Sequence, residues 1–285
     1  MTSSQAQTVP FYKMQGSGND FILFDNRSLR LPTSSMQRWA QKLCARAFSI
    51  GSDGLIFIDH PPVGSSLDYI WHFYNADGSR AEMCGNGSRC VAKLAYKLGI
   101  AGESQTFGTD AGPIRATILP EINEVKVQLT KPSEEQLHLT ITKDSGEEMD
   151  VHFINTGVPH AVLFANDVKK VDVAQMGKSI RYNTQFAPAG TNVNFVQIQD
   201  REHILLRTYE RGVENETYAC GTGASASVYI AHALGKCSEH VAVTTTGGES
   251  LTVHLENSDV FLQGHAQLVY TGHFQPQALG LEIPA

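Results

Sequence analysis

Short runs of β-branched and aromatic residues recur along the chain, separated by turns rich in glycine and asparagine. The runs at 21–24, 55–58 and 69–74 predict strands. Further strands are predicted at 151–154, 161–164, 195–198, 204–209, 241–244, 251–255 and 260–262. Strands outnumber helices, and their hairpin-like pairs favour antiparallel sheet over a doubly wound fold.

Apolar residues spaced by three and four positions predict a helix between the first two strands. Its apolar face carries Met36, Trp39, Ala40, Leu43, Cys44 and Ala47. Ser34 or Ser35 is expected to cap its N-terminus, and Cys44 is expected to be a core thiol. A second, short helix is predicted over 171–180. The polar stretch 132–146 is typical of either a domain crossover or a hairpin loop.

One segment of the sequence occurs twice. Residues 84–99 read CGNGSRCVAKLAYKLG and residues 220–235 read CGTGASASVYIAHALG, with six of sixteen positions identical. Each copy begins Cys-Gly-x-Gly, continues with a helical apolar spacing and ends in Leu-Gly. Gly99 and Gly235 are therefore predicted to end the helices in the left-handed conformation. The repeat predicts two similar domains, each with a helix that begins at a cysteine.

Composition narrows the possible functions. The chain has 285 residues with 22 Lys+Arg and 29 Asp+Glu, a net charge of −7. This net negative charge gives no indication of a basic surface that would bind nucleic acid, and the short apolar runs predict no membrane span. The polar N-terminus predicts a cytoplasmic protein. Five cysteines without a Cys-x-x-C pair predict free thiols and no metal site.

The repeated cysteines indicate proton-transfer chemistry. A cysteine at a helix start faces unpaired N–H groups, which favour the thiolate, and the following glycines let backbone amides approach a carboxylate. Two such cysteines on opposite faces of one carbon suit stereoinversion, because one removes a proton and the other returns one. A lone motif would more often be a small cysteine at a buried helix start. A cysteine hydrolase needs only one such thiol and a partner, for which only His160 is available.

Eight short motifs, in this order and spacing, resemble the diaminopimelate epimerase family over almost the whole chain. They are Gly16-Ser-Gly-Asn-Asp-Phe21, Gly51-Ser-Asp-Gly54, Tyr74-Asn-Ala-Asp-Gly-Ser79, Cys84-Gly-Asn-Gly-Ser-Arg-Cys90, Pro159-His160, Tyr209-Glu-Arg-Gly212, Cys220-Gly-Thr-Gly223 and Thr246-Gly-Gly248. The resemblance implies an α/β (α+β-like) fold of two pseudo-symmetric domains. Each is a mixed, mainly antiparallel sheet wrapped around a central helix. The expected N-terminal domain is 9–131, completed by 274–285, and the C-terminal domain is 132–273.

The resemblance also implies an activity. The family interconverts LL- and meso-diaminopimelate for lysine and peptidoglycan synthesis, without pyridoxal phosphate or metal. The expected partner is therefore a small-molecule substrate, diaminopimelate, and a homodimer is left open. Carried over to this chain, Cys84 and Cys220 are the acid/base pair. The implied substrate-binding residues are Asn19, Asn75, Gly85, Asn86, Asn192, Glu210, Arg211, Gly221 and Thr222, with His160 and Glu210 in supporting roles.

Residue chemistry agrees with these roles, although each residue alone has a plainer interpretation. An asparagine amide both donates and accepts hydrogen bonds, as an amino-acid head group requires, and Arg211 suits bidentate binding of a carboxylate. Taken singly, the asparagines are typical of turns, Glu210-Arg211 of a solvated surface pair, and His160 of a loop or core histidine.

Two positions depart from the family pattern. Gly54 stands where some members have a substrate-contacting Gln, and Val158 stands where many have Asn before Pro-His. Either departure is expected to loosen selectivity for the distal end of the substrate, unless a neighbour such as Asn155 compensates. The reaction type is thus better supported than the substrate, and a racemase of another amino acid is the first alternative. Proline racemases usually carry His where Asn86 stands, which disfavours that family. A non-catalytic amino-acid-binding protein would keep Asn192 and Arg211 without needing both thiols.

Overall fold

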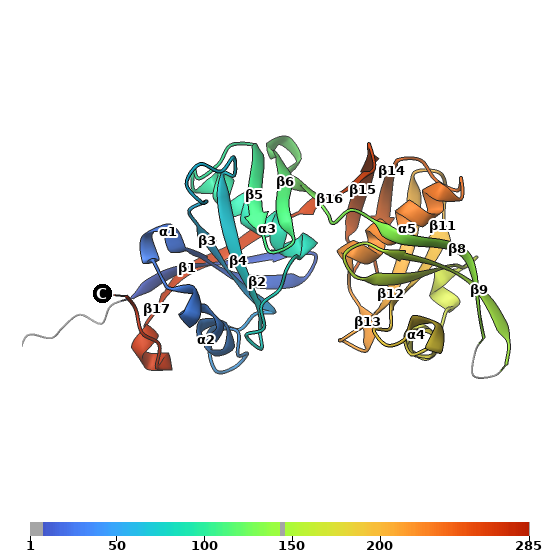
Figure 1. The fold of residues 1–285 in the computed structure, drawn as a ribbon, viewed down its shortest axis with the longest axis horizontal. Coiled ribbons are helices and arrows are strands. Elements are labelled where there is room, and N and C mark those ends of the chain that lie inside the picture. The colour runs from blue at the N-terminus through green and yellow to red at the C-terminus, as the bar shows by residue number, and fades with distance from the viewer. Residues whose placement is uncertain (1–7, 143–145, 285) are drawn as a thin grey trace, which may run out of the picture. The chain divides into compact units, whose positions relative to one another are not determined.

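The chain folds into two compact units in a computed structural model that describes residues 8–142 and 146–284. One unit comprises Met1–Val127 with His265–Ala285, and the other comprises Gln128–Gly264. Figure 1 shows the strands and helices of both units along the chain. No helix in the described residues is long and apolar enough to cross a membrane.

The first unit is built on a mixed sheet. Its strands lie in the order β17-β1-β2-β3-β4-β5-β6-β7, in which the β2–β3 and β4–β5 pairs are parallel and the others antiparallel. The elements are β1 (Val9–Gly16), β2 (Asn19–Asp25), α1 (Asn26–Leu29), α2 (Thr33–Leu43), β3 (Gly54–Asp59), β4 (Tyr69–Asn75), α3 (Gly85–Lys97), β5 (Ser104–Thr109), β6 (Gly112–Leu119), β7 (Glu124–Gln128) and β17 (Gln267–Phe274).

The second unit repeats this topology. Its order is β8-β9-β10-β11-β12-β14-β15-β16, and here β10–β11 and β12–β14 are the parallel pairs. A short strand, β13, pairs in addition with β12. The elements are β8 (Ser133–Thr142), β9 (Glu148–Asn155), β10 (Pro159–Phe164), α4 (Val173–Arg181), β11 (Asn192–Ile198), β12 (His203–Glu210), β13 (Asn215–Thr217), α5 (Gly221–Ala233), β14 (His240–Thr244), β15 (Ser250–Glu256) and β16 (Asp259–His265).

Parallel neighbours need a long connection, and a helix lies in that connection each time. Helices α2 and α3 lie between the strands of the two parallel pairs of the first unit, and α4 and α5 do so in the second. The two copies of the repeated segment therefore form equivalent helices, α3 and α5. The predicted fold class, two pseudo-symmetric domains with mixed, mainly antiparallel sheets, is confirmed.

The helices α3 and α5 are central and almost wholly buried. Helix α3 packs against β1, β2, β3, β6 and β17, and α5 packs against the equivalent β9, β10, β11 and β15. Burial extends to polar residues: Arg89 is fully buried, and Ser225 and Ser227 donate to the carbonyls of Gly221 and Gly223. Each helix is thus fixed on all sides rather than by one apolar stripe.

Both central helices end as the sequence predicts. Gly99 and Gly235 have φ of 67° and 70°, in the left-handed region that glycine adopts at low cost. The following residues, Ile100 and Lys236, donate to Ala95 and Ala231, which satisfies carbonyls left unpaired at the helix end. These bonds set the length of each central helix.

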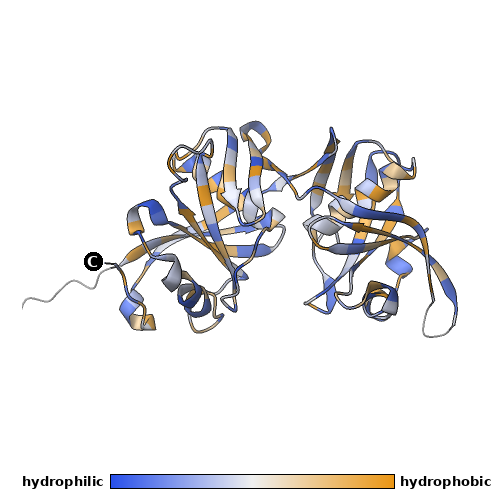
Figure 2. Ribbon diagram, viewed as in Figure 1, coloured by the Kyte–Doolittle hydropathy of each residue, from blue (hydrophilic) through white to orange (hydrophobic). Residues whose placement is uncertain are grey.

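Each unit has its own apolar core beside its sheet. In the first, Trp39 of α2 meets Phe24 and Phe57 of neighbouring strands, and in the second Tyr209 of β12 lies in the core beside α4. Figure 2 shows hydrophobic and hydrophilic residues interleaved along several strands, and in β6 buried residues alternate with more exposed ones, as in a strand with one buried face.

Some expected elements differ from the structure. Helix α2 spans Thr33–Leu43 and has Pro32 at its N-cap without a side-chain cap, so the predicted capping by Ser34 or Ser35 is wrong. Both serines lie inside the first turn. Ala47 has φ of 68° and is outside the helix, whereas Cys44 caps its C-terminus and is buried in the core as predicted.

The polar stretch 132–146 is also corrected. Most of it is strand β8, which in the part of the chain that the structure describes pairs with β9 alone, while 143–145 lie outside that part. Its side chains are mostly exposed because β8 is an edge strand, which explains its strand-atypical composition. Strands β1, β5, β6, β7, β13 and β17 also have no counterpart among the predicted strands.

The end of the chain returns to the first unit earlier than expected. Strand β17 pairs with β1 from Val9↔Phe274 to Gln15↔Gln267, in the position that β8 occupies in the second unit. The expected domains, 9–131 with 274–285 and 132–273, place most of this strand in the C-terminal half. Those boundaries remain a prediction about domains, and the sheet pairing favours a return at residue 265.

We expect Gly177→Ala to destabilise the second unit. A Cβ at Gly177 would lie 2.4 Å from Cβ of Tyr209, so packing excludes an alanine at this position. This holds even though alanine is about 1 kcal/mol more favourable than glycine inside a helix. Overpacking should lower the free energy of unfolding by about 1–3 kcal/mol in urea titrations. The exposed neighbour Gln175→Ala is the control and should change it by less than about 0.5 kcal/mol. Equal stability of the two variants would contradict the packing argument.

Candidate functional site

Cys84 occupies the N-cap of α3. Its backbone is extended, with φ −150° and ψ 120°, and its Sγ accepts a hydrogen bond from the Gly87 N–H at 3.4 Å. The sulfur therefore faces the positive end of the helix, where a thiolate is stabilised. The cysteine is only partly buried, so its sulfur is within reach of a small molecule.

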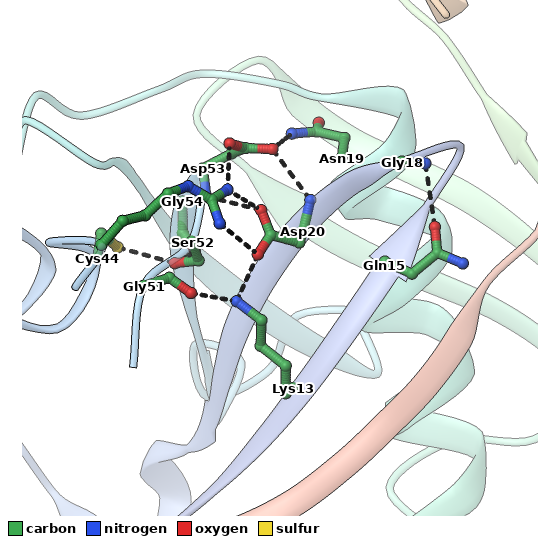
Figure 3. A network of polar contacts seen from close by, with 11 residues as sticks. Lys13, Gln15, Gly18, Asn19, Asp20, Cys44, Gly51, Ser52, Asp53 and Gly54 are labelled. Atoms are coloured by element: carbon green, nitrogen blue, oxygen red, sulfur yellow. Dashed lines mark hydrogen bonds and ion pairs between the residues drawn. The ribbon is translucent and has the colours of Figure 1, made fainter. Parts of the chain in front are cut away.

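The amide side chain of Asn19 lies against the Cys84 sulfur and is held by a second amide, that of Asn86. The Oδ1 of Asn19, on β2, lies 3.7 Å from Sγ and accepts a hydrogen bond from Nδ2 of Asn86 at 3.4 Å. The Nδ2 of Asn19 donates to Asp53 at 2.7 Å, as Figure 3 shows. The structure thus brings three predicted site residues, Asn19, Cys84 and Asn86, into contact.

Cys220 occupies the equivalent N-cap of α5. Its backbone is again extended, with φ −126° and ψ 107°, and its Sγ lies 3.5 Å from Oγ1 of Thr222. Space is tight here, because a Cβ at Gly223 would lie 3.2 Å from Sγ and 2.4 Å from Oδ1 of Asn194. The glycine at the fourth motif position therefore allows the start of α5 to pack closely against Asn194 of β11.

His160 lies on β10 and is fully buried. Burial, reinforced by the Arg211 charge, lowers the pKa of His160 to about 3, so the ring is neutral at pH 7. Asn194 donates from Nδ2 to Nδ1 of His160, since its Oδ1 accepts from Thr208. The ring proton is therefore assigned to Nε2, which has no hydrogen-bond partner among the described residues. A buried donor of this kind suits an anionic or sulfur ligand.

Asn192, Glu210 and Arg211 form a second polar group in the same unit. The Oδ1 of Asn192 accepts the Arg211 backbone N–H at 2.8 Å, and its Nδ2 donates to Pro159 O at 3.1 Å, so this side chain links β10 to the end of β12. The Glu210 carboxylate accepts from Thr217 at 2.8 Å. Burial raises the pKa of Glu210, while the Thr217 hydrogen bond opposes the shift.

The remaining predicted residue, Asn75, is the last residue of β4, where a turn begins. Its Nδ2 donates to Oγ of Ser79 at 3.0 Å and its side chain is exposed, so its local contacts are those of a turn asparagine. Gly85 and Gly221 are the first residues of α3 and α5, as predicted. Substrate contacts of all these residues remain proposals.

The two departures from the family pattern have structural counterparts. A Cβ at Gly54 would lie 2.7 Å from the Phe73 ring and 3.0 Å from Tyr74 O, so a Gln here would require Phe73 to move. Asn155, the candidate to compensate for these departures, uses its Oδ1 to accept the Gly157 N–H at 3.0 Å. Its amide is engaged in the turn before β10.

Sequence reasoning missed several residues that support the sites. Asp53 and Arg89 lie within quoted motifs but had no assigned role, and Asn194, which orients His160, lies in no motif. The signal for Asp53 and Arg89 was their position in the motifs, because a charge beside a glycine-rich turn needs a partner. For Asn194 the only signal was a polar residue inside an apolar strand.

Two histidine clusters in the second unit have ligand atoms close enough to hold a metal, which the sequence did not predict. Cross-strand pairing creates them, as in the His240↔His254 register. Hydrogen bonds within the clusters, such as His240 Nδ1 to His254 Nδ1 at 2.9 Å, account for their geometry. Neither includes a predicted site residue. The clusters are His138, Asp150 and His152, and His240, His254 and Glu256.

Comparison with known proteins gives a consistent result. A family profile described as Diaminopimelate epimerase matches residues 11–134 and 152–269. The protein of that name from Aquifex aeolicus (strain VF5) is 45% identical over 280 residues, covering 95% of this chain and 99% of that protein. The namesake from Archaeoglobus fulgidus is 35% identical over 285 residues, covering 96% and 99%.

Solved structures share the fold at low sequence identity. A hydroxyproline epimerase from Agrobacterium vitis superposes with a TM-score of 0.71 at 14% identity, over 97% of this chain and 96% of that one. A phenazine biosynthesis protein of the PhzF family from Bacillus anthracis gives 0.70 at 14% identity, over 94% and 99%. At this identity the likeness establishes the fold only.

We expect limited iodoacetamide treatment near neutral pH to modify Cys84 first. Burial raises the pKa of Cys44 and Cys237 to about 11 and that of Cys90 to about 12, so these thiols stay protonated and shielded. Cys220 is also buried and should react more slowly than Cys84. Peptide mapping by mass spectrometry measures the order. Early modification of Cys90 would contradict the description of the helix.

Proposed function

Because the chain belongs to the diaminopimelate epimerase family, we propose that it is an isomerase that interconverts LL- and meso-diaminopimelate. The observation that carries the proposal is the matched pair of cysteines, each at the N-cap of the central helix of its unit. The reaction provides meso-diaminopimelate for lysine and peptidoglycan synthesis. The same proposal includes a cytoplasmic location, which the five free thiols support.

The two thiols divide the reaction between them. The thiolate of one cysteine takes the proton from the α-carbon and becomes a thiol, while the thiol of the other gives its proton to the opposite face and becomes a thiolate. The number of protons on the enzyme is unchanged, and the roles are exchanged for the reverse reaction. The two sulfurs must therefore reach opposite faces of the same carbon. Both proton transfers are supplied by the chain itself, so the proposal assigns no step to pyridoxal phosphate or a metal.

Helix starts explain how a carbanion is tolerated. The charge that develops on the α-carbon spreads onto the adjacent carboxylate, and the first N–H groups of a helix stabilise an anion there. We assign this binding to the starts of α3 and α5, at Gly85-Asn86 and Gly221-Thr222. Such donors are fixed before the reaction and need no rearrangement as charge develops.

The remaining polar residues are assigned to the substrate's charged groups. Arg211 is proposed to bind a carboxylate, and Glu210, whose carboxylate is desolvated, to bind an ammonium group. Asn19, Asn75 and Asn192 are proposed to contact the amino-acid groups at the two ends of the substrate. His160 supports this arrangement through its buried Nε2–H, in a site where the ring stays neutral.

An alternative within the same chemistry is racemisation of another amino acid. The fold relatives include a probable proline racemase from Agrobacterium radiobacter at 15% identity, so the fold admits other substrates. Asn86 and the family relationship favour diaminopimelate. A binding protein without catalysis is the alternative from another class, and it would show no exchange of the α-proton.

We expect the reduced protein to introduce deuterium at an α-carbon of LL-diaminopimelate in deuterated water while forming the meso isomer. NMR and chiral chromatography measure the two events. Replacing Cys84 or Cys220 with Ala should slow epimerisation by at least about 10²–10⁴-fold, because neither sulfur can serve the other face.

Cys237→Ala is the matched control, since Cys237 lies just beyond α5 and is buried away from its N-terminus. It should leave turnover nearly unchanged when circular dichroism shows a folded protein. Proline is incubated in parallel. Exchange with proline but not with diaminopimelate would favour the alternative substrate, and exchange with neither would refute the epimerase proposal.

A further inference from the structure

A directed chain of hydrogen bonds passes beside Cys84. Arg89 Nη2 donates to Oδ1 of Asn86 at 2.9 Å, and Nδ2 of Asn86 donates to Oδ1 of Asn19 at 3.4 Å. Nδ2 of Asn19 in turn donates to Oδ2 of Asp53 at 2.7 Å. The chain begins at a fully buried guanidinium and ends at a carboxylate, and each amide between them donates in the same sense.

The two ends fix that sense. A guanidinium only donates hydrogen bonds and an ionised carboxylate only accepts them, whereas an amide has nearly the same shape in either orientation. Turning Asn19 round would place its oxygen against the oxygen of Asp53. It would also place its NH₂ group against that of Asn86. The charged ends therefore determine that Oδ1 of Asn19 faces the Cys84 sulfur, 3.7 Å away.

Asp53 is itself held firmly although it lies at the surface. Its Oδ1 accepts from Arg46 Nη2 at 2.8 Å, and its Oδ2 accepts from the Asp20 backbone N–H at 3.1 Å. Asp20 pairs with Arg46 and with Lys13, and the pair with Lys13 is labelled in Figure 3. Burial opposes ionisation of Asp20, but the hydrogen bonds from Lys13 and Arg46 prevail and lower its pKa.

We propose that Asp53 is a positioning residue that acts on Cys84 through Asn19. By holding Nδ2 of Asn19, the Asp53 carboxylate presents an acceptor to the sulfur, which favours the protonated thiol. The Gly87 N–H at 3.4 Å favours the thiolate. Opposed contacts of this kind suit a group that must both take up and release a proton. The inference rests on the proposed function only in giving Cys84 that task.

The charged and titratable groups on the elements around Cys84 define the control experiments. Removing Asp53 also removes a negative charge, and the loss of that charge by itself favours the thiolate. Asp20 carries an equal charge in the same network, but its carboxylate accepts from Arg46 and from the Asp53 backbone N–H instead of from the Asn19 amide, so Asp20→Asn is the matched control. The charged and titratable groups around Cys84 are Lys13 on β1, Asp20 on β2, Arg46 and Asp53 in the α2–β3 connection, and Arg89 and Cys90 on α3.

The test measures the rate at which iodoacetamide alkylates Cys84 as a function of pH. It uses the Cys220→Ala protein, in which the other three cysteines are buried. Asp53→Asn keeps the shape of the side chain, but its amide no longer forces the Asn19 Nδ2 group toward it, so Oδ1 of Asn19 is no longer held against the Cys84 sulfur. We expect the midpoint of the pH profile to fall by about one pH unit, since a neutral hydrogen bond is worth about 1 kcal/mol. Asp53→Ala, which removes the acceptor of the Asn19 Nδ2 hydrogen bond, should shift the midpoint in the same direction.

Two controls separate orientation from simple charge. Asp20→Asn should move the midpoint by less than a third of the Asp53→Asn shift. In an Asn19→Ala background, Asp53→Asn should produce no further shift, because the amide that transmits the effect is gone. A purely electrostatic effect would persist in that background.

The proposal is overturned by an unchanged midpoint in both Asp53 variants. It is equally overturned if Asp20→Asn, or Asp53→Asn in the Asn19→Ala background, shifts the midpoint as much as Asp53→Asn does alone. Alkylation needs only the Cys84 thiol and no diaminopimelate. A failure of deuterium exchange with a shifted midpoint would therefore refute the epimerase activity alone.

Discussion

Each unit depends on burying a helix that begins at a cysteine. A helix start has N–H groups without helical partners, and enclosing it in a sheet removes the water that would otherwise satisfy them. In α3 the cysteine sulfur meets one of these groups, and in both helices small residues allow the strands to approach. The strands of each sheet close around this central helix, and the crossover helices join the parallel strands of that sheet. The cysteine therefore lies at the helix end whose unpaired N–H groups the fold must satisfy in any case.

The two cysteines share this scaffold but differ in their surroundings. Cys84 is flanked by Asn19 and Asn86, whose orientation is set by charges at both ends of a hydrogen-bonded chain. The unit of Cys220 instead contributes a neutral, buried histidine and a desolvated glutamate. Pseudo-symmetry fixes where the sulfurs lie in their units, while the neighbouring side chains adapt each one separately. An enzyme whose substrate differs on its two sides has reason to keep such a difference.

Fold and substrate are determined at different levels. Proteins named as hydroxyproline epimerase and as PhzF share this architecture at 14% identity, so the duplicated sheet and helix do not select a substrate. The family relationship rests instead on identities spread over nearly the whole chain. Gly54 illustrates the point: the Phe73 ring and the Tyr74 carbonyl leave no room for a side chain there.

The sequence by itself determined the duplication, the helix starts at Cys84 and Cys220, and their ends at Gly99 and Gly235. These are local properties, because a cysteine followed by glycines and a helical apolar spacing act within one segment. It also identified strands with continuous apolar runs, such as β3, whose residues are buried on both faces.

Only the tertiary structure decided where polar segments belong. Ser133–Thr142 is a strand because β9 lies beside it, and 267–274 belongs to the first unit because β1 needs a neighbour. Likewise nothing local to Asp53 indicates that it orients Asn19, since the two meet only through the pairing of β2 with β3. Contacts between distant segments depend on strand register, which the sequence of either segment alone does not contain.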